Sequence, residues 1–148
     1  MTANVLNRFE QPVGGSLDNK LILGGSVVTD NAGASVKSKI VSIPIGDVST
    51  AGSVWVVPGI AGTILKISNV IDAAITTPDA GLTFEIGGVA ITDAAITIAF
   101  SGSGAGIVDQ STPSDLNVIT VSDAIEVVKD GSSNGTSNGV VTFEIELS

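Results

Sequence analysis

The last run of the chain alternates strictly between apolar and polar side chains. Every second position from Val141 to Leu147 is apolar, and the positions between carry a threonine and two glutamates. Successive side chains of a strand point to opposite faces, so a period of two predicts a strand with one buried and one solvated face. The same alternation is found in two earlier runs, Leu82, Phe84, Ile86 and Ile96, Ile98, Phe100. The chain is therefore expected to fold from short antiparallel strands.

The core of such a fold has to be aliphatic. Hydrophobic residues make up 43% of the 148-residue chain, but aromatic residues only 3%. β-Branched residues, glycine and serine are abundant, which favours strands and tight turns over helices. The tetrapeptide Thr83–Ile86 recurs as Thr142–Ile145. This recurrence suggests two equivalent strands, one in each of two sheets.

Turn signals divide the chain into about eight short strands. Pro58-Gly59 stops one strand, and Gly87-Gly88 predicts a tight hairpin turn. Pro44 marks either a strand end or an edge strand, because proline cannot donate a ladder hydrogen bond. The regular spacing of the strands predicts an all-β fold, an antiparallel sandwich or jelly roll.

The first 35 residues differ from the rest. They show no sustained period, and residues 1–39 carry a net charge of +1, against −10 for the remainder, within a total of −9. A segment of this composition does not build its own core. We expect an extended N-terminal arm over residues 1–35 and a sandwich body over residues 36–148. The apolar anchors of the arm are Val5, Leu6, Phe9, Leu21, Ile22 and Leu23.

The acidic body argues against two classes of partner. Its charge repels the phosphates of nucleic acids. The most apolar stretch, residues 54–75, is broken by a proline, two glycines and two charged residues, so it does not predict a membrane helix. The first ten residues lack the apolar run of a signal peptide. We expect synthesis in the cytoplasm, with neither nucleic acid nor membrane as a partner.

Residues that carry chemistry are scarce. The chain has no histidine and no cysteine, which excludes the usual nucleophile–base pairs and thiolate metal sites. Glu144 and Glu146 share a strand face, but they lack the aromatic platform of a sugar-cleaving site. The loop after Asp130 lacks the regular carboxylates of a calcium loop. Residues 102–113 begin with a glycine-rich run but lack a following helix, so they predict a connection. We expect no enzyme activity, no metal and no cofactor.

Trp55 is the only tryptophan in the chain. Its run, Val54–Val57, is apolar on both strand faces, which predicts a strand buried on both sides. Two interpretations follow. Trp55 is either a core residue or a contact residue at a subunit interface, where large aromatic side chains are enriched.

Several segments together resemble small head decoration (cement) proteins that tailed phages encode near the major capsid gene. The similarity includes the run Ile43–Pro58, residues 61–64 and 71–76, and the loop and final strand Gly131–Glu146. It covers about residues 40–147 and leaves the arm outside. The resemblance implies a homotrimer on the outer capsid surface of the virion, bound to the major capsid protein at capsomer junctions.

The resemblance also implies that extended termini grip the capsid. On this basis the six apolar arm residues named above are predicted to contact the capsid or a neighbouring subunit. Trp55 is the predicted contact of the trimer interface. Binding across junctions would stabilise the expanded shell by adhesion, without any reaction.

Two other functions are compatible with a small β-sandwich. A head-fibre or host-surface module that binds carbohydrate would need aromatic side chains on one face, whereas this chain has four phenylalanines, one tryptophan and no tyrosine. A small hydrolase is disfavoured by the missing bases. The decoration protein is therefore the leading prediction.

Overall fold

The computed structural model describes residues 22–23, 26–27 and 38–148. The chain divides into two compact units, Met1–Lys37 and Ser38–Ser148. The first unit contains the whole of the predicted arm, and the second contains the predicted body except residues 36 and 37.

Two very short strands are described in the first unit. β1 (Ile22–Leu23) pairs antiparallel with β2 (Ser26–Val27), so that Ile22 lies opposite Val27. The extended conformation predicted for the arm lies outside the described residues, as do four of its predicted contact residues, Val5, Leu6, Phe9 and Leu21.

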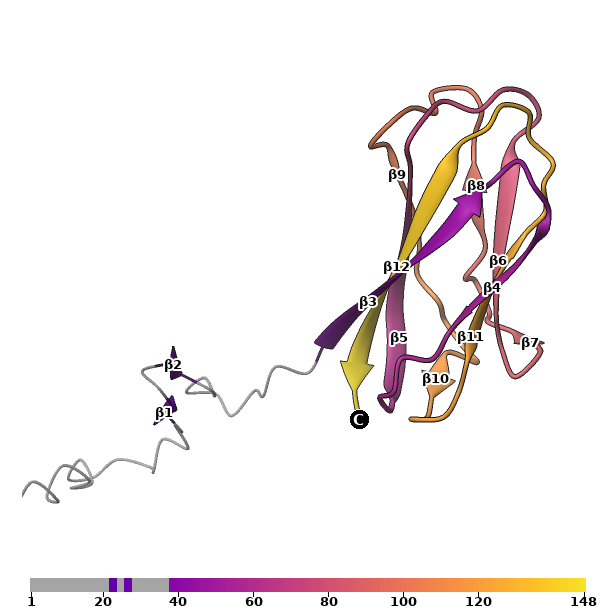
Figure 1. Ribbon diagram of the computed structural model, residues 1–148. Coiled ribbons are helices and arrows are strands. Elements are labelled where there is room, and N and C mark those ends of the chain that lie inside the picture. The colour runs from indigo at the N-terminus through magenta and orange to yellow at the C-terminus, as the bar shows by residue number, and fades with distance from the viewer. Residues whose placement is uncertain (1–21, 24–25, 28–37) are drawn as a thin grey trace, which may run out of the picture. The chain divides into compact units, whose positions relative to one another are not determined.

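The second unit is an antiparallel β-sandwich built from two five-stranded sheets (Figure 1). The β12 sheet has the order β10-β5-β12-β3, and β9 also pairs with β5. Its strands are β3 (Ser38–Asp47), β5 (Gly62–Ile71), β9 (Val108–Ser111), β10 (Val118–Ile119) and β12 (Asn138–Leu147).

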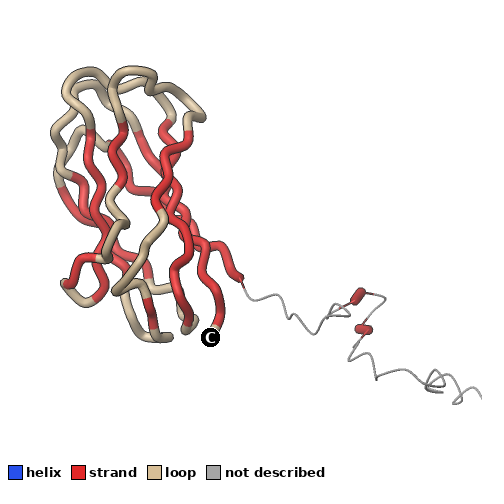
Figure 2. The backbone as a smooth tube through the Cα atoms, turned by 180° about the vertical axis from the view of Figure 1, so that it is seen from behind, coloured by secondary structure: helices blue, strands red, loops and turns tan. Residues whose placement is uncertain are grey.

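The β6 sheet has the order β4-β11-β6-β7, and β8 also pairs with β6. Its strands are β4 (Gly52–Val56), β6 (Ala80–Ile86), β7 (Val89–Ala90), β8 (Ile96–Ile98) and β11 (Ile125–Lys129). Figure 2 shows that the longer loops gather at the ends of this sandwich. The predicted fold class is confirmed.

Most of the strand predictions are confirmed, but the stretch that contains β9 and the burial of Phe100 were predicted wrongly. β9 lies in a stretch predicted to be a connection, because its sequence shows no clear alternation and its ladder partner, β5, is distant in sequence. The second error is Phe100, which was expected to continue the buried face of Ile98. It is 45% exposed, because β8 ends at Ile98 and the amide of Phe100 donates to Asp79 Oδ1 at 2.9 Å.

Pro44 and the double glycine behave as expected. Pro44 lies within β3, which is the edge strand of the β12 sheet, so the edge interpretation is the correct one. Gly87 and Gly88 join β6 to β7 with φ angles of 60° and 79°. Positive φ at both central residues defines the turn whose twist matches that of the flanking strands.

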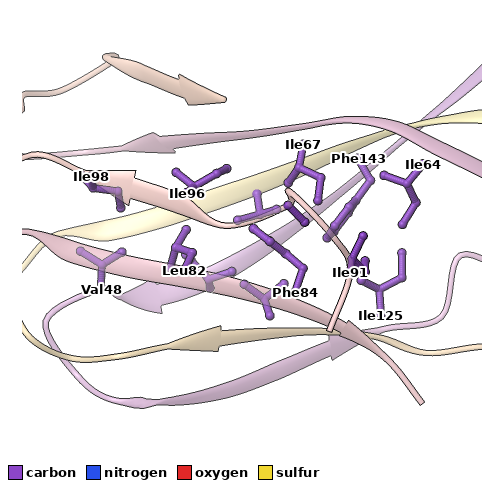
Figure 3. Close-up of a cluster of buried hydrophobic side chains, with 14 of the residues drawn as sticks. Val48, Ile64, Ile67, Leu82, Phe84, Ile91, Ile96, Ile98, Ile125 and Phe143 are labelled. Atoms are coloured by element: carbon purple, nitrogen blue, oxygen red, sulfur yellow. The ribbon is translucent and has the colours of Figure 1, made fainter. Parts of the chain in front are cut away.

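The two strands that share the repeated tetrapeptide form the centre of the core. β6 and β12 lie in different sheets, as predicted, and each has paired strands on both sides. Phe84 of β6 and Phe143 of β12 meet edge to face, with ring centroids 5.8 Å apart and ring planes at 89°. Aliphatic side chains from both sheets surround this contact (Figure 3).

One polar side chain is buried among them. Asn69 of β5 is fully buried, and neither its amide nitrogen nor its amide oxygen has a hydrogen-bond partner among the described residues. Its neighbour Gly139 leaves little space, since a Cβ there would lie 3.1 Å from Asn69 Oδ1. An unpaired buried amide lowers the stability of the folded state.

We predict that Phe143→Ala destabilises the sandwich by about 3–5 kcal/mol, because the substitution leaves a cavity between the sheets and removes the aromatic contact. Urea unfolding measures the change. Glu146→Ala, an exposed position on the same strand, is the control and should change stability by less than about 0.5 kcal/mol. A loss below about 1 kcal/mol for Phe143→Ala would contradict the central role of the contact.

We predict that Asn69→Leu raises the free energy of unfolding by about 1 kcal/mol, because leucine keeps the branched shape and removes the unpaired amide. Asn69→Ala serves as the comparison, since it removes the amide but leaves a cavity. If Asn69→Leu is as unstable as Asn69→Ala, then the amide of Asn69 has a hydrogen-bond partner in solution and does not lower the stability of the folded state.

Candidate functional site

Trp55 projects from the outer face of the β6 sheet. It lies in β4, an edge strand, and is 60% exposed, while Val57 beyond it is also exposed. Val54 and Val56 point the other way and pack against the core. The core interpretation of Trp55 is therefore wrong, and so is the expectation that this strand is buried on both sides within the fold. The apolar run Val54–Val57 predicted burial on both faces because the sequence does not distinguish a solvent-facing tryptophan from a buried one.

Two carboxylates share the row of Trp55 across the sheet. Glu126 of β11 lies directly opposite Trp55 on one side and opposite Glu85 of β6 on the other. Directly opposed side chains on one sheet face have Cβ atoms about 5 Å apart. The outer face of the β6 sheet thus presents an indole beside two like-charged groups.

An apolar row crosses the outer face of the β12 sheet. Val140 of β12 lies opposite Pro44 of β3 and opposite Val70 of β5, and Val70 in turn lies opposite Val108 of β9. Val140 is 44% exposed and Val108 is 52% exposed. We call these four residues the Val140 row. Their side chains lie on four neighbouring strands, so they form a continuous apolar strip.

The Val140 row could not be read from the sequence. The four members are far apart in sequence, and isolated surface valines are ordinary. Only the strand register brings the four together. The signal in the sequence was limited to Val140 itself, which extends the apolar face of the last strand onto its outer side.

The neighbouring row is uncharged. Thr142 shares a hydrogen bond of 2.9 Å with Ser42, and Gln110 Nε2 donates to Ser68 Oγ at 3.2 Å. Thr142 and Ser68 lie opposite each other, so the four residues form a second strip beside the first. An apolar strip flanked by small hydrogen-bonding groups is a surface that can be buried against a protein without leaving charges unpaired.

A shallow groove lies on one lateral side of the sandwich. It has a volume of about 370 Å³ and is lined by Ile86, Val89, Leu116 and Val118, with Asp115 as the single charged group. Val89 belongs to β7 and Val118 to β10, so the groove runs between the two sheets at their edges.

The residues considered for chemistry have structural partners. Glu144 lies 3.9 Å from the ammonium group of Lys66. Asp130 Oδ1 accepts the backbone N–H of Ser132, and Asn134 Nδ2 donates to the carbonyl of Thr77. In the part of the chain that the structure describes, no three acidic side chains come together to hold a metal ion.

Hydrogen bonds lower the pKa of two aspartates at one end of the sandwich. The pKa of Asp47 lies below its ordinary value of 3.8, because its carboxylate accepts the backbone N–H groups of Ser49 and Ser137, at 3.0 and 3.1 Å. The pKa of Asp72 is lowered by the side-chain and backbone N–H groups of Asn138, at 3.0 and 2.8 Å. These carboxylates fix loops and do not form a reactive centre.

Comparison with known proteins adds no assignment. No protein-family model matches the chain, and no curated protein matches its sequence. Among the described residues, no helix has the length and apolar character needed to cross a membrane. Interpretation of the surfaces therefore depends on their geometry and on the resemblance described above.

The lowered pKa values predict acid sensitivity. The unfolded chain takes up these protons before the folded chain does, so the stabilisation is complete above about pH 5 and is lost as the pH falls below about 4. Thermal unfolding between pH 7 and pH 2.5 tests this. Asp72→Asn should flatten the dependence, whereas Glu146→Gln, a change at an exposed carboxylate of β12, should leave it unchanged. An equally steep loss in Asp72→Asn would contradict the assignment.

Proposed function

We propose that this protein is a phage capsid decoration, or cement, protein that binds the outer face of the head at capsomer junctions. The Val140 row is the observation that carries the proposal. An exposed apolar strip across four strands of a rigid sheet, on a strongly acidic body, fits a protein that adheres to a larger surface. The resemblance over residues 40–147 implies that this surface is the major capsid protein, and we propose it as the partner.

The mechanism is additive adhesion. A protein that binds the expanded shell and not the unexpanded one stabilises the expanded shell by mass action, in proportion to occupancy. Each contact can be modest, because many copies act on one shell and a trimer attaches at three points at once. The remaining acidic surface limits association between virions.

The arm residues keep their proposed role. Val5, Leu6, Phe9, Leu21, Ile22 and Leu23 are proposed to contact the capsid or a neighbouring subunit, and Trp55 is proposed to contact a second copy. Ile22 belongs to the β1–β2 pair, and such a small hairpin is only marginally stable in water by itself. A partner surface would supply the missing stability.

A carbohydrate-binding module on a head fibre or host surface is the second candidate, and the exposure of Trp55 favours it. An indole face stacks on a sugar ring, and carboxylates such as Glu126 and Glu85 accept hydrogen bonds from hydroxyl groups. This function requires that Trp55 stays free in solution. If the wild-type chain binds glycans on an array and Trp55→Ala abolishes this binding, the result would support carbohydrate binding over adhesion to the capsid.

Co-sedimentation with expanded heads tests the leading proposal. Heads assembled from the major capsid protein of the same phage should bind the wild-type chain, and unexpanded heads should not. Val140→Asp should weaken binding by about tenfold or more, because it places an unpaired charge in the buried strip. Thr83→Asp, on the outer face of the opposite sheet, is the matched control and should bind as the wild type does.

Two negative results of this experiment would have different meanings. Equal binding of Val140→Asp and the wild type would show that the Val140 row is not the contact surface. Failure of the wild type to bind expanded heads would overturn the proposed function itself.

A further inference from the structure

Leu116 is held in an unfavourable backbone conformation on the surface. Its φ angle is 55°, and its side chain is 53% exposed. Leucine rarely adopts positive φ, because its Cβ crowds the backbone there. On one side the carbonyl of Asp115 accepts the amide of Thr92 at 3.0 Å, and on the other the carbonyl of Asn117 accepts the amide of Ile64 at 2.9 Å. Backbone strain imposed in this way is concentrated at sites of binding.

The strained leucine forms part of the groove wall. With Val89 of β7 and Val118 of β10, which are 52% and 66% exposed, it presents three aliphatic side chains to solvent around one concave surface. The groove has a volume of about 370 Å³, close to the lower end of the range for ligand pockets. Asp115 is the one charged residue that lines it. The groove has the size and lining for one large apolar side chain.

The side chain that matches the groove is Trp55, which lies at the edge of the β6 sheet opposite Val89. In the order β4-β11-β6-β7, Trp55 is on β4 and Val89 is on β7. The two edges are separated by three interstrand spacings, or about 14 Å. Trp55 is the only tryptophan of the chain and is 60% exposed. A projecting indole and an apolar groove at opposite edges cannot meet within one sheet, but they can meet between two copies.

We propose that Trp55 of one copy inserts into the groove formed by Ile86, Val89, Leu116 and Val118 of a second copy, giving head-to-tail association. Such a contact joins two different surface patches, and its repetition around an axis produces a closed ring. The contact has to be apolar, since the bodies carry like charge and repel each other elsewhere. The inference rests on the proposed function, because a ring is what lets one adhesive surface act several times on a shell.

Two variants of the full chain test the contact. Trp55→Ala removes the projecting side chain and keeps the groove, whereas Val118→Asp keeps Trp55 and places a charge in the groove. Sedimentation equilibrium should show a multi-copy wild type. Each variant should weaken self-association by about 30-fold or more, the effect of losing a central interface residue. Unchanged mass in either variant would overturn the proposal.

Mixing the two variants provides a sharper test. Each variant retains one half of the contact, so an equimolar mixture should form 1:1 dimers and nothing larger. Trp55→Ala contains no tryptophan, so the fluorescence of the mixture reports only the indole of Val118→Asp. Its emission should shift to shorter wavelength when the partner is added. A mixture that stays monomeric, or an emission that does not move, would overturn head-to-tail association.

Leu116→Asn separates binding from folding. Asparagine tolerates positive φ, so this variant should unfold at the same temperature as the wild type or higher, while its self-association weakens. A clear loss of thermal stability would show that Leu116 serves its own fold, and would contradict the proposal.

Val140→Asp distinguishes failure of the ring from failure of the proposed function. It should keep the wild-type mass and bind expanded heads about tenfold or more weakly than the wild type. If Trp55→Ala has the same mass as the wild type and both still bind expanded heads, the ring is wrong and the adhesive function stands. If the ring forms but the wild type does not bind heads, the function is wrong and the ring stands.

Discussion

The contact between Phe84 and Phe143 joins the two sheets, and the rest of the body is arranged around it. Each ring lies on a central strand, so each is flanked by paired strands whose inward side chains are aliphatic. A chain with few aromatic residues places two of them where they bury the most apolar surface. The core is otherwise built mainly from isoleucine and valine, whose β-branched side chains pack well on pleated sheets but require close matching in volume.

Polar contacts complete one end of this core. Lys129 points inward from β11, is nearly buried and donates to the carbonyl of Asp47 at 2.9 Å. The buried hydroxyl of Ser137 donates to the carbonyl of Ala73 at 2.8 Å. These bonds link loops that are far apart in sequence and satisfy polar groups that burial would otherwise leave unpaired. The end of the sandwich is thereby held rigid, and the sheets present fixed surfaces.

Three surfaces follow from that rigidity, and they differ in chemistry. The Val140 row is a flat apolar strip, Trp55 is a single projection, and the groove is a concave apolar surface with a strained leucine in its wall. A flat strip suits a broad partner, whereas a projection and a groove suit each other. The proposed adhesion to a shell and the proposed association between copies therefore use separate parts of the molecule.

The sequence by itself determined most of the strands and their inward faces, because alternation with a period of two is a local property that a half-buried strand carries in its own residues. Thus the last strand, the β6–β7 hairpin and the placement of the two repeated tetrapeptides in different sheets could be predicted. Tertiary structure decided the features that depend on the pairing of strands. It placed Trp55 on an edge strand, made β9 a strand through its ladder with β5, and joined Val140 to Val70 and Val108. Strand order and register are set by contacts between distant segments, and no local pattern encodes them.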